Sequence, residues 1–424
     1  MAFVLLCFQL HMFKKAIQKY LNNFTGFSRE IWILAIITFI NRAGTMVLPF
    51  LSKYLKEDLG FSYSQVGWIM VCFGFGSMLG SWLGGKLSDK IGFYKVMVFS
   101  LFTSGLMFFG LQKITSFEGL MVAIFLIMVV ADMFRPAMFV SLAAYAKPEN
   151  RTRALTLVRL AINLGFAAGP ALGGLIIMNI GYQGLFWIDG ASCIIAILIF
   201  WYLVKEKQKS SYLNKEQPGE ILTASVFRDG PFWIFLTACL ITGILFFQLF
   251  TTLPLYHKEQ FDLTEFQSGL LLTLNGFVIF LLEMPIVNYI ENNKLNKIKI
   301  ITIGTFAMAM SMLLLLFNVW AGILIIMILF MTIGEMFAFP FSNSFALSRA
   351  PKGHEGRYMA IFTMSYSLAH ILSAKTGMTI IDNYGYQANW LFMGGLGIIG
   401  ALLCYWVMIL VRKENQTKKI VRIK

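Results

Sequence analysis

Patterns that would indicate an ATP-driven pump or a hydrolytic enzyme are missing from this sequence. The phosphate-binding pattern G-x-x-x-x-G-K-[ST] does not occur, so the chain is not itself an ATP-driven pump. No nucleophile elbow or hydrolytic triad is visible, and the only long loop, 205–230, holds no catalytic constellation. We therefore expect a protein that is not an enzyme.

Cysteine is also scarce, and its spacing excludes the common metal sites. The cysteines are far apart, and most of them lie inside apolar runs. They are Cys7, Cys72, Cys193, Cys239 and Cys404. Because no metal-ligand spacing is present, we interpret them as small core residues and expect neither a metal nor another cofactor.

Apolar residues are in excess, at 58% of the 424 residues. A soluble domain contains about 45–50%. The excess forms long continuous runs, and a helix needs roughly 20 apolar residues to cross the hydrocarbon core. Only helices and closed barrels satisfy the backbone in lipid, and a barrel would show short alternating segments. The sequence therefore predicts an all-α membrane protein.

The runs predict twelve spanning helices in two groups of six. The first group is expected at 31–55, 62–84, 96–112, 117–145, 154–180 and 183–204, and the second at 231–256, 264–288, 299–317, 319–347, 358–381 and 387–411. A charged stretch with Pro218 and Gly219 separates the groups and is typical of a linker. The predicted organisation is an N-terminal segment 1–30, a bundle 31–204, a linker 205–230, a bundle 231–411 and a tail 412–424.

The net charge of +14 is unevenly placed. Most of the 35 Lys and Arg lie in the two tails, the linker and alternate short loops. By the positive-inside rule, this asymmetry places both termini and the linker in the cytoplasm. Basic tails fit anionic lipid better than nucleic acid, so we expect a lipid bilayer as partner and no nucleic acid. A bacterial cytoplasmic (inner) membrane is the expected location.

The opening run MAFVLLCFQLHMF is apolar but too short to span a bilayer. Lys14 and Lys15 follow this run instead of preceding it, which argues against a cleaved signal peptide. The run is either a helix that lies on the membrane surface or a stretch upstream of a start at Met12, and we favour the second.

Short motifs recur in the two groups of spans, in the same order and at offsets of 202 to 204 residues. The pairs are Tyr54-x-Lys56-Glu57 with Tyr256-x-Lys258-Glu259, Ser62-x-x-Gln65-x-Gly67 with Thr264-x-x-Gln267-x-Gly269, Asp132-Met133-Phe134 with Glu335-Met336-Phe337, Pro148 with Pro351, and Gly181-Tyr182-Gln183 with Gly385-Tyr386-Gln387. Such ordered matches indicate a duplicated half. Since six spans separate the copies, they are parallel repeats, an arrangement typical of transporters with a substrate site at the repeat interface.

The loop after the second span carries a resemblance to a known family. It reads Gly85-Lys86-Leu87-Ser88-Asp89-Lys90-Ile91-Gly92-Phe93-Tyr94-Lys95 and resembles the major facilitator signature G-x-L-[SA]-D-[KR]-x-G-[RK]-[RK]. It departs from the signature at Phe93 and Tyr94, where basic residues are usual, and Lys95 supplies a positive charge one place later. The resemblance implies that Asp89 pairs with a neighbouring helix end or arginine and latches the cytoplasmic side shut. The alternative is an ordinary solvated turn.

The fifth span carries a second resemblance, to a motif of proton-coupled drug antiporters in the same superfamily. It contains Gly165, Gly169, Pro170, Gly173 and Gly174 in a pattern similar to G-x-x-x-G-P-x-x-G-G. Glycines four residues apart allow close helix contact, and proline bends a helix, so we interpret these residues as mechanical parts and not as ligands. With twelve spans and a central linker, the resemblance covers essentially the whole chain.

Ionisable groups inside spans are costly, so each is a functional candidate. The predicted proton and substrate pathway consists of Arg42, Asp132, Arg135, Gln248, Glu283 and Glu335. Lys375, His370, Arg159 and Asp189 are weaker candidates, and Asp189 reads as a helix-end group. Aromatic and thioether side chains around Pro340, namely Met336, Phe337, Phe339 and Phe341, suit apolar recognition, although such residues also face lipid.

The resemblance implies that spans 1, 4, 7 and 10 line a central cavity, where Asp132 and Glu335 would face each other. Asp132 and Arg135 are three residues apart and are expected on one helical face. Burial favours the neutral form of a carboxylic acid and a nearby arginine favours the ionised form, so such a pair is a plausible proton switch. Our hypothesis is that Asp132 and Glu335 carry the proton or bind cationic substrate, with Arg42 and Arg135 as charge partners. The alternative is a set of static ion pairs.

Three functions are compatible with these features. The leading hypothesis is a secondary active transporter that works by alternating access and couples protons to the efflux of small amphiphilic or cationic compounds. The second is a proton-coupled importer of a peptide, sugar or other metabolite, in which the arginines of spans 1 and 4 clamp an anionic group. The third is a membrane enzyme or a scaffold that transports nothing. One chain contains both halves, so we expect a monomer.

Overall fold

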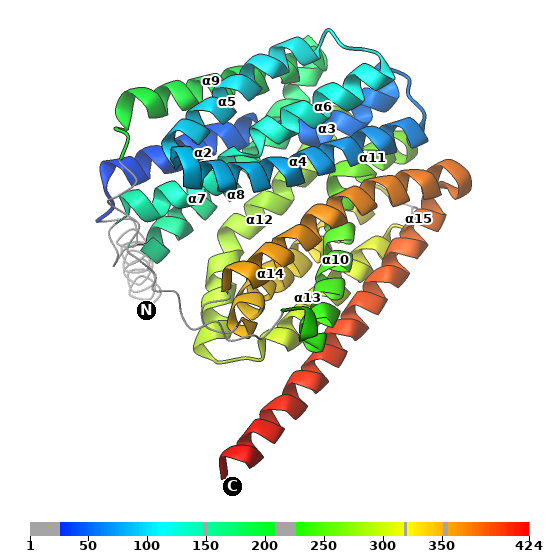
Figure 1. Ribbon diagram of the computed structural model, residues 1–424. Coiled ribbons are helices and arrows are strands. Elements are labelled where there is room, and N and C mark those ends of the chain that lie inside the picture. The colour runs from blue at the N-terminus through cyan, green and yellow to red at the C-terminus, as the bar shows by residue number, and fades with distance from the viewer. Residues whose placement is uncertain (1–25, 147–150, 208–225, 318–319, 351–354, 424) are drawn as a thin grey trace, which may run out of the picture.

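The computed structural model describes residues 26–146, 151–207, 226–317, 320–350 and 355–423, and helices dominate this part of the chain (Figure 1). Eleven helical stretches within it are long and apolar enough to cross a membrane. The last of them, Ile361–Glu414, contains two predicted spans, because Gly385 at φ 80° interrupts the helical backbone. The predicted all-α membrane fold is confirmed, whereas the linker predicted at 205–230 lies mainly outside the described residues.

The helices α2 to α9 form one group, which we call the N-terminal bundle. It contains α2 (Arg29–Gly44), α3 (Val47–Lys53), a π-helical turn (Tyr54–Asp58), α4 (Tyr63–Ile91), α5 (Phe93–Leu111), α6 (Phe117–Ala131), α7 (Phe134–Tyr145), α8 (Arg151–Ile180) and α9 (Gln183–Leu203). Two spans that the sequence predicts as single helices are broken here. The first is divided between α2 and α3, and the fourth between α6 and α7.

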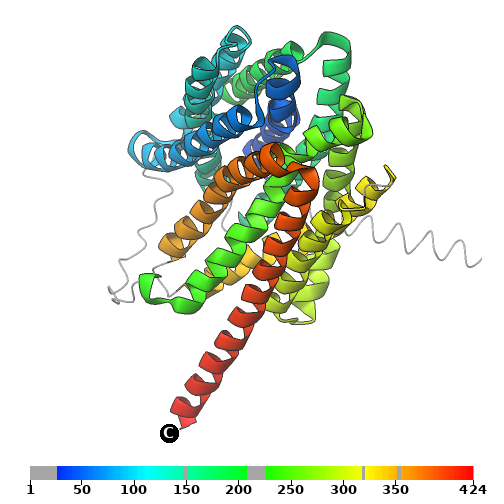
Figure 2. The same ribbon diagram turned by 90° about the vertical axis from the view of Figure 1, so that its right-hand side faces the viewer.

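The helices α10 to α15 form the C-terminal bundle. After a short 3-10 turn (Val226–Arg228), it contains α10 (Gly230–Thr251), α11 (Leu253–Phe261), α12 (Glu265–Asn292), α13 (Lys297–Leu314), α14 (Ile323–Arg349) and α15 (Glu355–Ile423). The last part of α15 projects from the bundle, through the segment predicted as a tail (Figure 2).

Three hydrophobic cores hold the helices together. One core lies wholly in the N-terminal bundle, around Phe134 and Phe200, and another wholly in the C-terminal bundle, around Phe235 and Phe341. The third and largest includes buried residues of both bundles, such as Phe50 and Trp390. The bundles meet mainly through α8 against α12 and α4 against α15.

The repeated sequence motifs have local structural roles. The Ser62 hydroxyl accepts a hydrogen bond from the Gln65 backbone N–H, and the Gln65 side chain accepts one from the Ser62 N–H. Thr264 and Gln267 repeat this capping box before α12. A capping box satisfies two backbone donors that the first turn leaves free, so the repeat marks the start of the second span in each bundle.

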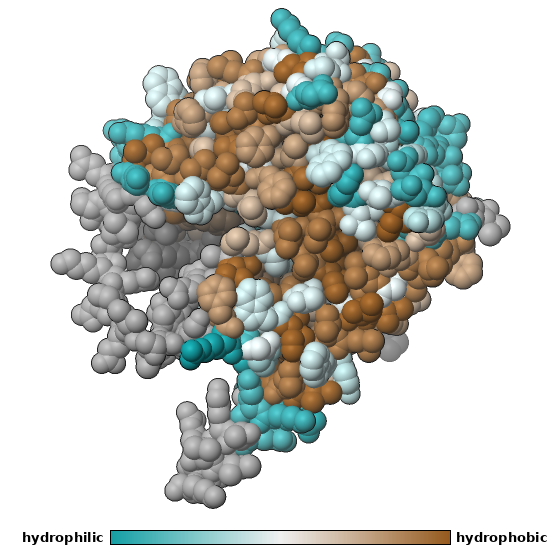
Figure 3. All heavy atoms as spheres, turned by 45° about the vertical axis from the view of Figure 1, so that its right-hand side comes forward, coloured by the Kyte–Doolittle hydropathy of each residue, from teal (hydrophilic) through white to brown (hydrophobic). Residues whose placement is uncertain are grey.

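Apolar side chains cover much of the outer surface, as a membrane protein requires. Figure 3 shows brown apolar residues across the middle of one face, with hydrophilic residues at its upper right edge and along the projecting end of α15. Exposed large apolar side chains include Trp82, Ile180, Trp201 and Leu402. A soluble monomer rarely exposes so large an apolar surface, so this surface agrees with the membrane class predicted from the sequence.

Candidate functional site

A cavity of about 590 Å³ lies between the two bundles. Helices of both bundles contribute to its walls, including α2, α6, α7 and α8 on one side and α10, α12, α14 and α15 on the other. Five of the six residues of the predicted pathway line it: Arg42, Asp132, Arg135, Glu283 and Glu335. The cavity therefore gathers charges that are up to about 300 residues apart in the sequence.

The break in the first span places Arg42 at the cavity. α2 ends at Gly44, where an added Cβ would overlap the Ser192 side chain, and α3 starts at Val47. The Asp189 carboxylate accepts hydrogen bonds from the backbone N–H groups of Met46 (2.8 Å) and Val47 (3.1 Å). An acid at a helix N-terminus satisfies free donors and complements the helix dipole. Asp189 was expected as a simple helix-end group, but it lies within α9, caps the N-terminus of α3 and is buried beside the cavity.

The break between α6 and α7 corrects the expectation for Asp132 and Arg135. Asp132 follows the last residue of α6, and α7 begins at Phe134, so the two residues do not share one face of a continuous helix. Within the described residues, no ion pair joins them. Instead, the Ser77 hydroxyl of α4 donates a hydrogen bond to the Asp132 carboxylate. Arg135 extends its exposed side chain into the cavity.

Glu335 is the buried acid of the opposite wall. It is 6% exposed, and its carboxylate accepts a hydrogen bond of 2.8 Å from the Asn275 amide of α12. In the described part of the chain, no Lys, Arg or His forms an ion pair with it. Asp132 and Glu335 are therefore equivalent in one respect: each is held by a neutral donor from a helix of its own bundle.

Glu283 has a different partner from the two acids above. Its carboxylate forms an ion pair with Arg159 of α8 and accepts a hydrogen bond of 3.2 Å from Asn163. Because Glu283 belongs to α12, this contact joins the two bundles at the cavity wall. The geometry fits the static-pair alternative for Glu283 better than a proton carrier.

Gln248, the sixth predicted pathway residue, does not line the cavity. It is fully buried, and its amide group donates hydrogen bonds to the carbonyl (3.1 Å) and hydroxyl (2.8 Å) of Ser373. These contacts hold α10 against α15. Gln248 therefore lies on the face of α10 that packs against α15 and not on the face that lines the cavity. The residue type alone does not predict which face of the helix it occupies.

An aromatic wall covers the C-terminal side of the cavity. Phe246, Phe247 and Phe250 of α10 line it, together with Phe339 of α14 and Tyr366 of α15. Of the aromatic residues predicted around Pro340, Phe339 lines the cavity, whereas Phe341 is buried in the C-terminal core. The phenylalanines of α10 are not among the predicted site residues, although Phe250 follows Phe247 by three residues and Phe246 by four, which places it beside both on a helix.

His370 of α15 also lines the cavity, although its sequence signal was weak. Its ring packs between Phe73 (5.0 Å between centroids) and Phe247 (4.6 Å), one from each bundle. Lys375, on the same helix, lies over Trp68 at 4.5 Å and does not reach the cavity. Among the described residues, no group of three or more His, Cys, Asp or Glu is placed to hold a metal ion.

Polar contacts join the two bundles at the end where α3 and α11 lie (Figure 1). We call it the closed end. Lys53 forms an ion pair with Glu265 at 2.9 Å, and the Tyr63 hydroxyl donates to Glu259 at 2.6 Å. Glu57, the repeat equivalent of Glu259, accepts a hydrogen bond of 3.4 Å from Tyr182. The repeated Lys-Glu motif thus supplies polar contacts in both bundles at this end.

The glycines of the fifth span lie at close helix contacts. A Cβ on Gly165 or Gly169 would meet the backbone of α2, and one on Gly173 would meet Phe50 and Met46. A Cβ on Gly174 would lie 2.6 Å from the Glu265 carbonyl oxygen, and Pro170 touches Gly269 of α12. The motif therefore packs α8 against both the broken first span and the opposite bundle at the closed end.

The loop between α4 and α5 carries the motif predicted as a latch. Gly92 adopts φ 91°, a conformation that favours glycine, whereas Gly85 has open space around it. Lys90 and Lys95 are exposed, and the side chain of Asp89 lies outside what the structure describes.

Phe93 and Tyr94, which depart from the signature, are both buried. The Tyr94 hydroxyl donates to the Val204 carbonyl at 3.1 Å, and the Phe93 ring meets Tyr145 edge-on at 5.6 Å. Where the signature has basic residues, this chain thus has buried aromatic residues that contact α7 and the end of α9.

Comparisons with known proteins agree with this architecture. The family model described as Major Facilitator Superfamily matches residues 34–374. The uncharacterized MFS-type transporter YttB of Bacillus subtilis (strain 168) is 24% identical over 85% of this chain and 90% of its own length. The Na(+), Li(+), K(+)/H(+) antiporter of Planococcus maritimus is 21% identical over 89% and 95%. The quinolone resistance protein NorA of Staphylococcus aureus is 26% identical over 59% and 64%.

Solved structures share the fold. The nucleoside transporter NupG superposes with a TM-score of 0.75 at 15% identity, over 89% of this chain and all of NupG. The peptide transporter POT in complex with sulfate gives a TM-score of 0.76 at 15% identity, over 92% and 96%. The family model matches most of the chain. The chain belongs to the major facilitator superfamily of membrane transporters.

Proposed function

We propose that this transporter works by alternating access and exports small amphiphilic compounds in exchange for protons. The observation that carries the proposal is the pair Asp132 and Glu335, two carboxylates from opposite bundles in one cavity. Each accepts a hydrogen bond from a neutral side chain, and within the described residues neither is ion-paired. An acid inside a membrane span that no ion pair holds is a candidate proton carrier, and of these two Glu335 is buried and Asp132 is partly buried.

The proposal includes an orientation and a location. Both termini and the linker lie in the cytoplasm of a bacterial inner membrane, as the distribution of Lys and Arg favours. The closed end then faces outward, and substrate enters the cavity from the cytoplasm. The bundles 31–204 and 231–411 would rock about this cavity within a single monomer, with Asp89 latching the cytoplasmic side when it closes.

Two relatives whose names state an activity support exchange and export. One is named a Na(+), Li(+), K(+)/H(+) antiporter, and another a quinolone resistance protein. The aromatic wall, with Met336 beside it, suits apolar substrates of varied shape.

Proton movement in proteoliposomes tests the proposal. A pH dye inside the vesicles reports proton flow while an amphiphilic compound is added on the cytoplasmic side. We expect flow opposite to the compound, reduced at least about tenfold in Asp132→Asn and in Glu335→Gln. Asp382→Asn, which changes an exposed acid elsewhere on α15, is the matched control and should transport normally. Coupled flow that survives in both cavity variants would reject the two acids as carriers.

Arg42 and Arg135 favour a second candidate, a proton-coupled importer. Neither arginine forms an ion pair within the described residues, and a guanidinium binds a carboxylate or phosphate through two hydrogen bonds. Proton flow in the same direction as a peptide or an organic anion would establish import and replace the export proposal.

A further inference from the structure

The two walls of the cavity carry different chemistry. On the N-terminal wall, Arg42 and Arg135 line the same cavity, together with the acid Asp132. The Asp132 carboxylate already accepts the Ser77 hydroxyl, and the Asp189 carboxylate is occupied by two backbone N–H groups. Within the described residues neither Arg42 nor Arg135 forms an ion pair, so both retain hydrogen-bond donors for an acidic ligand.

Both arginines are accessible from the cavity. Arg135 is exposed and Arg42 is half-buried, and both line the same space. Arg42 has its guanidinium 5.8 Å from the Phe166 ring, a contact that leaves its hydrogen-bond donors free in the plane of the group. A guanidinium offers five donors in a planar fork that matches an acidic group.

The aromatic wall on the C-terminal side forms one continuous surface. Phe246 meets Phe339 edge-on at 5.0 Å, and it contacts Phe247 at 5.2 Å and Phe250 at 5.5 Å. Phe339 in turn contacts Tyr366 at 5.6 Å. Such a surface binds a flat apolar body through ring-to-ring contacts and burial of apolar area.

We propose that the cavity binds an aromatic compound that carries an acidic group. The acid binds Arg42 and Arg135, and the aromatic body lies against Phe246, Phe247 and Phe339. Glu335 is then left for the coupled proton. This inference rests on the proposed function and narrows its substrate class from amphiphiles in general to organic anions and zwitterions with an aromatic body.

Three matched probes separate the acidic group from the aromatic body. They are 2-naphthylacetate, 2-naphthylacetamide and 2-(2-naphthyl)ethylamine, which share one ring system and differ in charge. Binding to the purified full chain is measured by calorimetry. We expect the acid to bind at least about tenfold more tightly than the amide or the amine, and cyclohexylacetate to bind more weakly than the naphthyl acid.

Arg42→Gln and Arg135→Gln test the residues directly. Each should weaken binding of 2-naphthylacetate at least about tenfold and change binding of the amide less than about twofold. Lys299→Gln, which removes an exposed charge at the start of α13, is the control and should leave both affinities unchanged. Arg135→Lys, which keeps the charge but loses the fork, serves as a second variant that is expected to fold and to bind with intermediate affinity.

Binding and transport decide separate questions. If the acid binds no more tightly than the amide, including the case in which neither binds, the substrate inference is overturned. It is also overturned if both arginine variants bind the acid as the parent does. If the acid binds as expected but moves no protons in the opposite direction in vesicles, the substrate inference stands and the proposal of proton-coupled export fails.

Discussion

The Lys53 ammonium lies 2.9 Å from the Glu265 carboxylate and joins the two bundles at the closed end of the cavity. The Lys53 side chain is fully buried, and Glu57, one turn further along, lies 3.9 Å away. The pair thus couples the end of the broken first span to the start of α12. Since a buried ion pair stabilises only the arrangement in which both partners meet, its loss should shift the chain away from this conformation.

Glu265→Gln is the first variant that we would make. It leaves the buried Lys53 with only the longer ion pair to Glu57 at 3.9 Å. Breaking a fully buried pair costs about 3–5 kcal/mol, and the cost is smaller here because Glu57 remains and Glu265 is 19% exposed. We expect the closed end to open more often, so that a cysteine at Thr45, which lines the cavity, is labelled faster by an impermeant maleimide from that side.

Asp262→Asn is the matched control for that variant. It breaks the ion pair of Asp262 with Lys258 at the same end, but both side chains there are exposed and lie within one helical turn. Exposed pairs contribute about 0–1 kcal/mol, so labelling should not change. Equal labelling in Glu265→Gln and in Asp262→Asn would contradict a closing role for Lys53 and Glu265.

Gly174→Ala should act on the same end through packing. A Cβ there would lie 2.6 Å from the Glu265 carbonyl oxygen, so α8 and α12 would have to separate. We expect faster labelling at the closed end and a lower melting temperature in detergent, by an amount that corresponds to about 1–3 kcal/mol. Gly110→Ala, at a helical position with open space around it, is the control and should be neutral or slightly stabilising.

Asp189 is expected to hold the break between α2 and α3. Asp189→Ala removes the acceptor for two backbone N–H groups and leaves them buried, which costs about 1–3 kcal/mol for each group. Asp189→Asn keeps one acceptor oxygen and should lose less. Thermal unfolding in detergent gives the order of the two variants, and equal melting temperatures for Asp189→Ala and the parent would remove Asp189 from this role.

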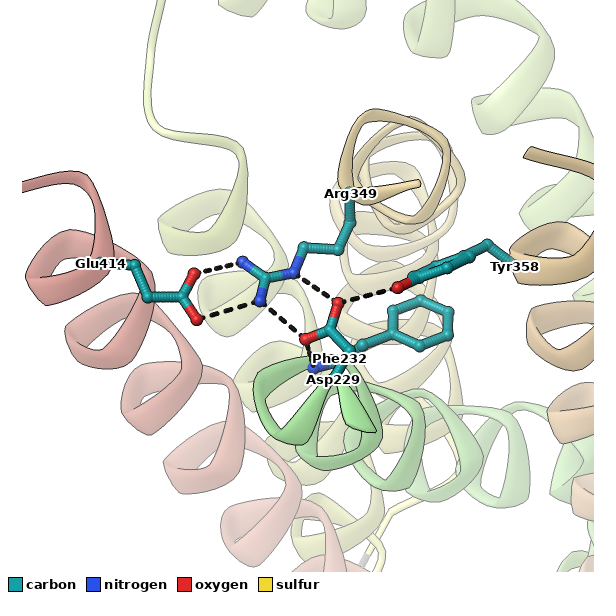
Figure 4. Close-up of polar contacts among 5 residues, drawn as sticks. All are labelled: Asp229, Phe232, Arg349, Tyr358 and Glu414. Carbon is teal, nitrogen blue, oxygen red and sulfur yellow. Dashed lines mark hydrogen bonds and ion pairs between the residues drawn. The ribbon is translucent and has the colours of Figure 1, made fainter. Parts of the chain in front are cut away.

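Asp229 gives a pH dependence outside the membrane-spanning segments. It precedes α10 and binds Arg349 through two hydrogen bonds of 2.7 and 2.8 Å, while Tyr358 donates a third at 3.1 Å (Figure 4). Burial by itself would raise the pKa of Asp229, but the hydrogen bonds and charge of Arg349 outweigh it, so the pKa lies below its usual value. Arg349 also binds Glu414 at the end of the last span.

A lowered pKa in the folded state stabilises the fold above the unfolded value of about 3.9. This stabilisation is lost as the pH falls through the folded pKa. We expect the melting temperature of the parent to drop on acidification. Asp229→Asn should have a lower melting temperature at neutral pH, and its melting temperature should depend less on pH in the acidic range. Tyr358→Phe, which removes one hydrogen bond, should fall between them. If the melting temperature of Asp229→Asn falls with acid as steeply as that of the parent, other groups set the pH dependence.

Local features of the fold were predictable from short stretches of sequence. The capping boxes at Ser62 and Thr264 follow from residue types three positions apart, and Gly181 and Gly385 both adopt positive φ between consecutive spans. These features depend on neighbours within one turn. The same holds for the apolar runs, since a helix in lipid satisfies its own backbone whatever its neighbours are.

The pairing of the charges was not predictable in this way. Arg159 and Glu283 are 124 residues apart, and their contact depends on how α8 and α12 face each other. Gln248 illustrates the same limit, because a small rotation of α10 decides whether a polar residue lines the cavity or bonds to Ser373. The break at Asp132 is different, because Pro136 in the first turn of α7 has no N–H to donate to the Asp132 carbonyl and so gives a local signal for the break.

By itself, the sequence determined the membrane class, the duplicated arrangement of motifs and the set of charged residues inside the spans, since all three follow from composition and order along the chain. Only the tertiary structure decided which charges share the cavity, which are paired and which face an aromatic wall. The physical reason is that hydropathy constrains each span separately, whereas the rotation and breaks of a helix depend on close packing against residues far away in the sequence.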